Sequence, residues 1–591
     1  MAYKHQKPNP SAMMDGYAAQ FRAEQQATPP SAEKYAALFA ADYGAFHRLL
    51  AELWQARDLE AILETGEVLR RHGELNRKYA PRYCAALLWA ERFQDALDLL
   101  TAPATADPQS ALHHWQMTRA LAGVGRTAEA MDAAQRALAL GPELQPAGLL
   151  QTLAEHEPLQ ARLDELSAWA PFARLIELKL RLGQKREPAQ LLILAAERGA
   201  PASAQDRAGF FALVQRLAPW IAPQDLPRFV RSLRPLAQTA PALEEIDAVL
   251  SLLGAADRDA PPAHVEGPSP DDAGLLRSLA LACAAGGRRK AALSRLCAWS
   301  PPRRTPEADV LAMARIVGEQ ILAETPLRLK PHGGQRRIIN LTPFNNERLM
   351  LRIKLREMAP WVDHFVIVEA AETFTGRPKP LYFSQWKDEF ADLEPKITHV
   401  VIDAFPSCIS AAWAREFYQR DLPALALADL AGPEDLVLIT DTDEVVRRAA
   451  IESFEGELAR LHVDTFRYFL NHRQVVGEGR QKHYGSVVKA RYLQRYGASY
   501  CRSQLARTDA NAFIADAGWH FTSIADPEGI VDKVTSYSHQ EHAHRDASYF
   551  HAMLEQIRHG GGEPGWARCE IDESFPAYIR DHQGELEARI L

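Results

Sequence analysis

Apolar residues recur at helical spacing along the first half of the chain, from residue 36 to about residue 255. Leu, Ala and Trp fall three or four positions apart, and Gly, Pro or charged residues interrupt them at short intervals. The clearest unit is Ala111–Pro142, where Gly125 separates two helical patterns and the small residues Ala130 and Ala137 allow close packing. Stacked antiparallel helices produce this pattern. We therefore predict an all-α region over residues 36–255 that resembles a tetratricopeptide-like solenoid, the alternative being an irregular helical domain.

The segments that flank the helical pattern predict the limits of the domains. Residues 1–35 lack a sustained apolar period, which predicts a flexible tail. Residues 256–272 cluster Pro, Gly and Asp and are interpreted as a linker. Residues 273–330 return to helical spacing and predict a helical connector. A polar break at Lys330–Arg336 precedes the last predicted domain, residues 331–591.

The apolar pattern changes in kind from Arg337 onward. Short apolar runs alternate with helical patterns, which predicts an α/β domain with a parallel-rich sheet. Strands are expected at Ile338–Leu341, Phe365–Glu369, Thr398–Asp403, Leu436–Thr440 and Thr465–Leu470, and helices at Glu347–Met358, Ala411–Leu430 and Ala449–Leu461.

Composition narrows the class of protein. The chain has 591 residues, 47% hydrophobic and 24% charged, which is typical of a globular protein with several domains. A formal net charge of −8 gives no overall basic field, so we do not expect a nucleic-acid partner. No apolar run is long enough for an integral membrane segment, and no secretory signal is recognisable. We expect a cytoplasmic location.

The strongest chemical signal is a cluster of acids after the run Leu436–Ile439. This run is typical of a strand buried on both faces, and Asp441, Asp443 and Glu444 follow it at once. Ligand sites of α/β sheets open at the carboxyl ends of strands, where these acids fall. A divalent cation, Mn²⁺ or Mg²⁺, would let them stay ionised together. The alternative is a solvated acidic turn.

A second cluster, His539-Gln-Glu-His542-Ala-His544, has spacing that could supply metal nitrogens. His539 is therefore a candidate third metal ligand, beside Asp441 and Asp443. The alternative is an ordinary solvated loop.

Four ordered blocks resemble glycosyltransferase family 17 over Arg337–Gly584. They are Phe344-Asn-Asn-Glu347, Phe365–Leu381, Asp441-Thr-Asp-Glu444, and Ala517-Gly-Trp-His-Phe521 with Pro527–Lys533. The resemblance implies a GT-A-like domain with one Rossmann-like nucleotide-binding sheet. It also implies inverting transfer from a UDP-sugar, UDP-N-acetylglucosamine being favoured, to a glycan or protein acceptor, with Mn²⁺ or Mg²⁺.

The chain departs from the family pattern in one block. Val445-Val446-Arg447 stands where a proline often follows the acids in the family. The vertebrate members work in the secretory pathway, whereas nothing in this sequence indicates secretion. The acceptor is therefore left open.

Residues in these blocks have candidate roles, each with an alternative. Asp443 is the preferred metal ligand, and Asp441 reaches the ribose or a metal-bound water. The block around Phe344 contacts the nucleotide, with Asn346 and Glu347 either binding uracil or ribose or capping the next helix. Glu369 ends a strand at the same edge and is expected to contact the nucleotide.

The later blocks are expected to bind the phosphates and the sugar. Arg377 and Lys379 suit the diphosphate, or form an exposed basic loop. Trp519 and His520 could stack on and hydrogen-bond a sugar, although Trp519 could also be a core residue. Asp516 and Glu541 are the candidate general bases, with Asp516 slightly preferred.

Three functional hypotheses follow. The first is a metal-dependent glycosyltransferase whose solenoid recruits the acceptor or a protein partner. The second is a helical scaffold with a vestigial nucleotide-sugar site. The third is an enzyme like the nucleocytoplasmic protein O-GlcNAc transferases, which modify proteins and also join tetratricopeptides to a transferase. Those enzymes have a two-lobed, metal-independent transferase fold. The Asp-X-Asp block counts against the third.

Overall fold

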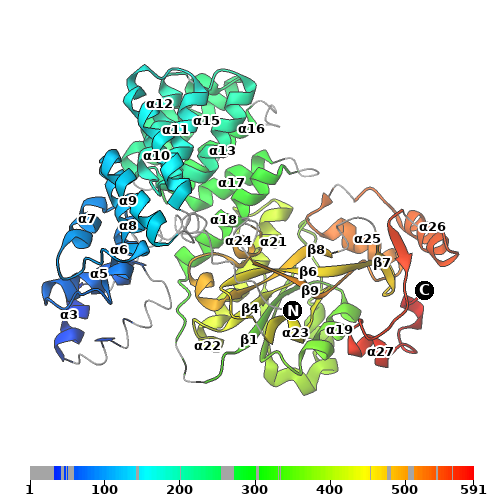
Figure 1. The fold of residues 1–591 in the computed structure, drawn as a ribbon. Helices are drawn as coiled ribbons and strands as arrows, with labels where there is room; N and C mark the ends of the chain where they lie inside the picture. Colours follow the sequence, from blue (N-terminus) through cyan, green and yellow to red (C-terminus); the bar gives the residue numbers. More distant parts are fainter. Residues whose placement is uncertain are drawn as a thin grey trace. The chain divides into compact units, whose positions relative to one another are not determined.

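A computed structural model gives the fold of the chain. It describes residues 32–41, 46–47, 50, 59–141, 146–199, 201–254, 272–300, 305–330, 332, 334–452, 454–475, 481–503, 512–540, 543–561 and 564–591. These residues fall into two compact units (Figure 1). We call the described residues up to Gly287 the helical unit, and Arg288–Leu591 the sheet unit.

The helical unit contains the helical pair predicted from Ala111–Pro142. Its two helices are in contact, and Gly125 makes the turn between them with a positive φ of 79°. Ala130 and Ala137 are fully buried on the second helix, as close packing requires. The described helices of this unit are α3 (Ala32–Ala41), α5 (Leu59–Arg71), α6 (Ala80–Trp89), α7 (Phe93–Thr101), α8 (Ala111–Gly123), α9 (Thr127–Leu140), α10 (Pro146–Ala161), α11 (Trp169–Arg181), α12 (Arg186–Glu197), α13 (Ala204–Leu217), α14 (Leu226–Ser232), α15 (Ala240–Gly254) and α16 (Ala273–Ala285).

These helices confirm the predicted helical character of the N-terminal half, whereas the tetratricopeptide register stays a prediction. None of the described helices in either unit combines the length and apolar content that crossing a lipid bilayer requires.

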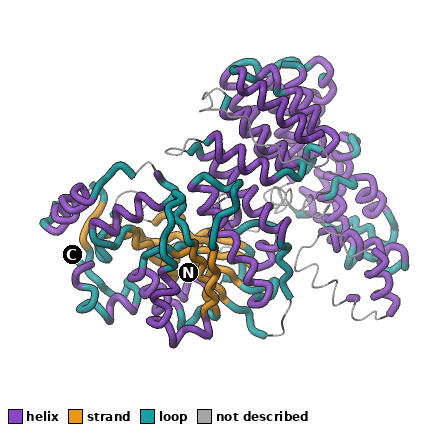
Figure 2. Tube along the Cα trace, turned by 180° about the vertical axis from the view of Figure 1, so that it is seen from behind, coloured by secondary structure: helices purple, strands orange, loops and turns teal. Residues whose placement is uncertain are grey.

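The sheet unit is built on a mixed sheet of ten strands, ordered β10-β7-β6-β8-β4-β1-β2-β3, with β9 paired to β5 and β6. Strands β1 to β4 are parallel to their neighbours among themselves, as predicted, whereas β4 pairs antiparallel with β8. Figure 2 shows these strands among the helices of the unit. The strands are β1 (Ile338–Phe344), β2 (His364–Ala370), β3 (Ile397–Ile402), β4 (Leu436–Ile439), β5 (Glu444–Val446), β6 (Leu458–Arg467), β7 (His472–Gln474), β8 (Gln481–Lys489), β9 (Ala512–Thr522) and β10 (Trp566–Arg568).

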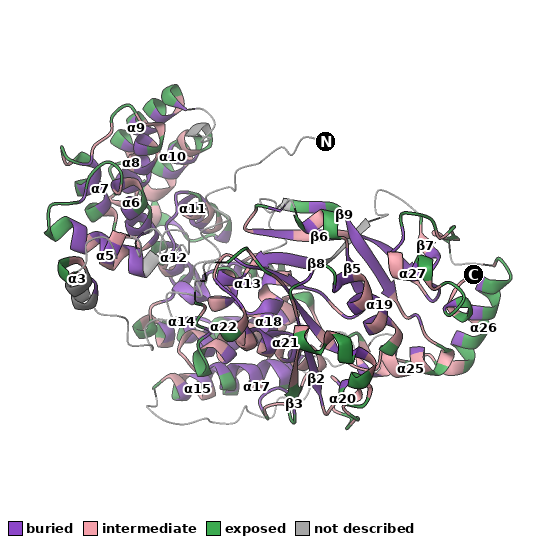
Figure 3. Ribbon diagram, turned by 90° about the horizontal axis from the view of Figure 1, so that it is seen from below, coloured by how far each residue is buried: buried purple, intermediate pink, exposed green. Residues whose placement is uncertain are grey.

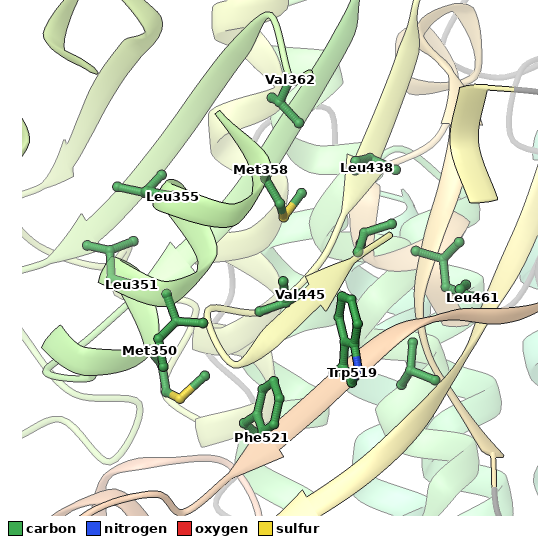
Figure 4. Packing of buried hydrophobic residues seen from close by; sticks show 14 of the residues in the cluster. Met350, Leu351, Leu355, Met358, Val362, Leu438, Val445, Leu461, Trp519 and Phe521 are labelled. Carbon is green, nitrogen blue, oxygen red and sulfur yellow. The ribbon is translucent and has the colours of Figure 1, made fainter. Parts of the chain in front are cut away.

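Helices cover the sheet and bury its central strands (Figure 3). All four residues of β4 are fully buried, as its unbroken apolar run predicted. Met350, Leu351 and Leu355 of α19 pack into the main core of the unit (Figure 4). The helices of the unit are α17 (Arg289–Trp299), α18 (Glu307–Glu324), α19 (Arg348–Met358), α20 (Tyr382–Trp386), α21 (Ala412–Asp421), α22 (Leu427–Leu430), α23 (Arg448–Glu452), α24 (Ala498–Ser503), α25 (Pro527–Ser536), α26 (Ala547–Arg558) and α27 (Ala577–Asp581).

Three element predictions for this unit are wrong in extent. The strand expected at Thr465–Leu470 is the end of β6, which begins at Leu458 and stops at Arg467. The helix expected at Ala449–Leu461 ends at Glu452, and β6 already begins at Leu458, because Gly456 interrupts the helical pattern. The helix expected at Ala411–Leu430 is divided after Asp421, where Pro423 cannot donate the hydrogen bond that a continuing α-helix requires.

Helix α18 belongs to the sheet unit although it lies before residue 331. It packs on α21 and α24, and Ile316, Val317 and Ile321 on it are buried. A Cβ on Gly318 would come within 2.7 Å of the Cα of Gly497, so the backbones approach closely here. Removing α18 would expose an apolar face of the unit.

This packing predicts the shortest fragment that folds. A fragment that begins at Arg288 keeps α17 and α18 and should be soluble, with a cooperative thermal transition. A fragment that begins at residue 331 should aggregate or melt at least about 10 °C lower, because it loses the buried face of α18. Size-exclusion chromatography and calorimetry compare the two. Equal solubility and equal melting temperatures would show that α18 is dispensable for the fold.

Asp421 lies buried at the contact of these helices. Its Oδ1 accepts a hydrogen bond of 2.6 Å from the backbone N–H of Ser499 in α24, and its Oδ2 has no partner among the described residues. Burial raises the pKa of Asp421 to about 7, which the hydrogen bond from the Ser499 backbone N–H only partly opposes. The neutral acid is therefore the form that suits this site.

Stability should fall as the pH rises toward 7. The folded state binds the Asp421 proton more tightly than the unfolded state does. The free energy of unfolding therefore begins to fall above the pKa of Asp421 in the unfolded state, and the loss is complete above about pH 7. The full loss is at most about 4 kcal/mol. Asp421→Asn should remove this part of the pH dependence and raise the melting temperature at pH 8 more than at pH 5. Asp388→Asn, at an exposed position, is the control. Parallel melting curves against pH for Asp421→Asn and wild type would contradict this role.

Candidate active site

A cavity of about 720 Å³ opens at the carboxyl ends of β1 and β4. These strands are parallel neighbours, so the segments that follow them meet at one edge of the sheet. Side chains from other elements complete its wall. Its charged or polar lining residues include Asn345, Glu347, Lys379, Glu416, Arg420, Asp441, Asp443, Glu444, Arg502, His520 and Lys533.

The end of β4 is held by a buried polar network. The ammonium of Lys354, fully buried on α19, donates to Thr440 Oγ1 at 2.7 Å and to the backbone oxygen of Asp441 at 2.8 Å. Asn340 Nδ2 on β1 also donates to Thr440 Oγ1, at 2.7 Å. Burial lowers the pKa of Lys354 to about 7, although the carboxylates of Glu444, Asp441 and Asp443 oppose that shift. The network fixes the backbone from which the acids project.

Asp441 lies between two guanidinium groups. Arg420 on α21 contacts its Oδ1 at 2.9 Å, and Arg502 on α24 contacts its Oδ2 at 2.9 Å. Arg502 also binds Glu444 Oε1 at 2.6 Å, and Glu444 Oε2 accepts the backbone N–H of Asp441 at 2.8 Å. Burial would raise the pKa of Asp441, but the charges of Arg420 and Arg502 outweigh it and lower the pKa to about 2. Both carboxylate oxygens of Asp441 therefore have cationic partners.

Asp443 faces a different cation. Lys533 on α25 contacts its Oδ2 at 2.6 Å and Glu347 Oε1 at 3.2 Å. His520 Nε2 on β9 lies 3.5 Å from Asp443 Oδ1. Burial opposes ionisation of Asp443, but Lys533 and His520 hold its pKa well below the usual range. Two blocks that are far apart in the sequence, Asp441–Glu444 and the segment of His520 and Lys533, thus meet in this cavity.

The block after β1 contributes through different residues from those predicted. Phe344 is a buried core residue at the cavity wall, and Glu347 lines the cavity as expected. The side chain of Asn346 donates to the carboxylate of Asp532 on α25 and does not line the cavity. Its neighbour Asn345 does, and the buried Oδ1 of Asn345 has no hydrogen-bond partner among the described residues.

Glu369 supports the local fold. Its fully buried carboxylate accepts hydrogen bonds from the backbone N–H groups of Tyr382 and Phe383, at the start of α20. Lys379 Nζ lies 3.5 Å from it, and Lys379 lines the cavity, whereas Glu369 does not. Arg377 donates to Ser536 Oγ at 2.8 Å and also lies outside the cavity lining.

The late block presents alternate residues to opposite sides of β9, as a strand must. His520 lines the cavity, whereas Trp519 packs in the core beside Val445, and its Nε1 donates to the backbone oxygen of Ser574 at 2.9 Å (Figure 4). Asp516 is 65% exposed, pairs with Arg447 at 3.3 Å and does not line the cavity.

The predicted metal ligands do not form one cluster. His539 lines the cavity and is exposed, with its ring 4.7 Å from that of Trp413, while Asp441 and Asp443 are held by the cations given above. Among the described residues, no group of three or more His, Cys, Asp or Glu side chains could hold a metal ion. Glu541, the other candidate base, lies outside the described residues.

No sequence motif indicated Lys354, Arg420 or Arg502. Each is a single basic residue in a helical pattern without a motif, and its role depends on contacts across the fold.

Most of the residues that line this cavity lie in a region that is similar to known proteins. Residues 327–559 match the family model of Glycosyltransferase family 17. The curated β-1,4-mannosyl-glycoprotein 4-β-N-acetylglucosaminyltransferases of Rattus norvegicus and Homo sapiens are each 27% identical over 295 residues. The aligned region is 44% of this chain and 53% or 54% of the relative, so the chain spans about half the length of the curated relatives it matches. Residues 327–559 of this chain therefore form a glycosyltransferase family 17 domain.

Proposed function

We propose that this chain transfers N-acetylglucosamine from UDP-N-acetylglucosamine to a glycan or protein acceptor, with inversion at the anomeric carbon. The observation that carries the proposal is the meeting of Asp443, His520 and Lys533, from separate family blocks, in one cavity at the ends of β1 and β4. The names of the relatives, which are N-acetylglucosaminyltransferases, support the sugar. The GT-A-like assignment of the sheet belongs to the same proposal.

The donor would bind across the ends of β1 and β4. Asn345, whose Oδ1 lacks a described partner, would accept the imide N–H of uracil, beside Phe344 and Glu347. Lys533 and Lys379 would contact the diphosphate. Asn346, Glu369 and Arg377 would act indirectly in this arrangement, because each holds a neighbouring segment through the contacts given above.

The charge of the cavity favours a divalent cation with the donor. Seven carboxylates and five Lys or Arg side chains are among its described lining residues. These side chains alone would not neutralise the negative charge of a bound diphosphate. Asp443 Oδ1 and His520 Nε2, 3.5 Å apart, are a suitable pair of donors for Mn²⁺ or Mg²⁺, with further ligands from the diphosphate. When bound, the cation would neutralise charge on the departing diphosphate. Asp441 would act through Arg420 and Arg502, and His539 would not belong to this metal site, because its ring lies beside that of Trp413.

The protein residues would then remove one proton from the acceptor and stabilise the leaving diphosphate. The acceptor oxygen forms the new bond to the anomeric carbon, the bond to the diphosphate oxygen breaks, and a carboxylate takes the acceptor proton. Of the two candidate bases, Glu541 follows the cavity residue His539 by two positions, whereas Asp516 is exposed outside the cavity. Lys533 would stabilise the charge that develops on the leaving diphosphate. The helical unit would recruit the acceptor or a protein partner.

The donor site can be tested at Asp443. UDP-N-acetylglucosamine with Mn²⁺ should raise the melting temperature of the wild type, and EDTA should abolish the rise. Asp443→Asn should lose the Mn²⁺-dependent rise and at least about 100-fold of turnover, because it removes charge opposite Lys533 and His520. Asp429→Asn, an exposed position on α22, is the control. Near-normal turnover of Asp443→Asn with Mn²⁺ would place the metal elsewhere, and a wild type without donor binding would favour a non-catalytic scaffold.

The general base can be tested with a matched pair of variants. Glu541→Gln should lower kcat by about 100- to 10,000-fold while the Kd for UDP stays within about twofold, because a base acts only on the acceptor proton. Asp516→Asn should keep wild-type kcat. Initial rates at saturating donor and calorimetric UDP titrations provide the two readouts. The reverse result, with Asp516→Asn inactive and Glu541→Gln active, would contradict the assignment.

A further inference from the structure

The cavity has an aromatic part that the donor site does not use. Trp413 on α21, Tyr537 and His539 line it, and we call these three residues the aromatic cluster. The ring of His539 lies 4.7 Å from that of Trp413 and 5.5 Å from that of Tyr537. Trp413 and Tyr537 are half-buried, so part of each ring surface is open to the cavity.

Helix α21 sets the distance between this cluster and the donor site. Trp413, Glu416, Phe417 and Arg420 occur at helical spacing on α21, and all four line the cavity. Arg420 follows Trp413 by seven positions along the α-helix, which is a rise of roughly 10 Å. Arg420 contacts Asp441. The aromatic cluster therefore lies about one to two sugar rings away from the strand-end acids, within the same cavity.

The first turn of α18 forms the adjoining wall. Glu307, Val310 and Leu311 fall at positions i, i+3 and i+4, which place them on one face, and all three line the cavity. Helices α18 and α21 pack on each other (Figure 1). Glu307–Glu324 lies before residue 327, where the match to the family begins. This part of the cavity is thus built partly by residues outside the family match.

We propose that the aromatic cluster and the first turn of α18 form an acceptor subsite that binds a pyranose ring; the inference rests on the proposed function. The apolar C–H face of a pyranose packs on an aromatic ring, while its hydroxyls need hydrogen-bond acceptors at the edge. Trp413 and Tyr537 offer ring surface, Val310 and Leu311 offer apolar wall, and the carboxylate of Glu307 offers acceptors.

A saccharide fits these residues better than a peptide segment does. A peptide that binds by strand addition is held through its backbone by the edge of a sheet, and a peptide that binds in an aromatic-lined groove is rich in proline. The described residues of this part of the cavity come instead from two helices and from the segment 537–539 after α25. Continuity with the donor site also favours the acceptor sugar as the occupant, because the attacking hydroxyl must reach the anomeric carbon.

Saturation-transfer NMR on the full chain tests the subsite. The probes are methyl β-D-mannopyranoside, methyl β-D-glucopyranoside and a Ser/Thr-rich peptide, each with UDP and Mn²⁺ present. We expect ring-proton signals from at least one pyranoside, a loss of at least about fivefold in Trp413→Ala, and recovery in Trp413→Phe. Val310→Trp should also remove the signal, because it fills the subsite and leaves the cluster in place. Tyr549→Ala, an exposed aromatic residue outside the cavity, should leave the signal unchanged.

Binding of UDP, followed by the melting temperature, separates the two proposals. UDP binding that is normal in all variants, together with pyranoside signals that survive Trp413→Ala and Val310→Trp, would overturn the subsite and leave the proposed function intact. Transfer to the peptide alone, dependent on Trp413, would overturn the saccharide assignment. A wild type that binds no UDP would instead refute the proposed function on which the subsite depends.

Discussion

The pairing of strand-end carboxylates with buried cations is the constraint on which the site depends. Asp441, Asp443 and Glu444 are crowded after β4, and like charges so close would otherwise favour protonation. Arg502 bridges Asp441 and Glu444, while Lys533 holds Asp443. The acids stay ionised because cations from α21, α24 and α25 reach them, and removal of one cation would leave a carboxylate uncompensated in a partly buried cavity.

The same constraint ties the cavity to the helices that surround it. Arg502 can reach the acids only if α24 keeps its place, and α24 is held by Asp421 and by the close approach of Gly318 to Gly497. Helix α18, which carries Gly318, also forms part of the cavity wall at Leu311. The packing of the unit and the wall of the cavity therefore depend on common elements, and α18 belongs structurally to the unit that contains the sheet.

Local chemistry was predictable from the sequence, and contacts across the fold were not. An unbroken apolar run ending in Asp441 and Asp443 predicted a buried strand with acids at its end, because both features are adjacent in the chain. The sequence could not show that Glu369 would bind the start of α20, since that contact depends on how the intervening loop turns. Strand alternation could have separated Trp519, which packs in the core, from His520, which lines the cavity.

A crystal structure of the chain with UDP and Mn²⁺ would show whether donor and metal meet at the ends of β1 and β4. Anomalous scattering locates the manganese independently of the nucleotide. We expect a manganese peak within coordination distance of Asp443 and His520, the diphosphate next to Lys533, and the uracil at the end of β1 beside Asn345. UDP bound away from the ends of β1 and β4, with this cavity empty, would contradict this expectation.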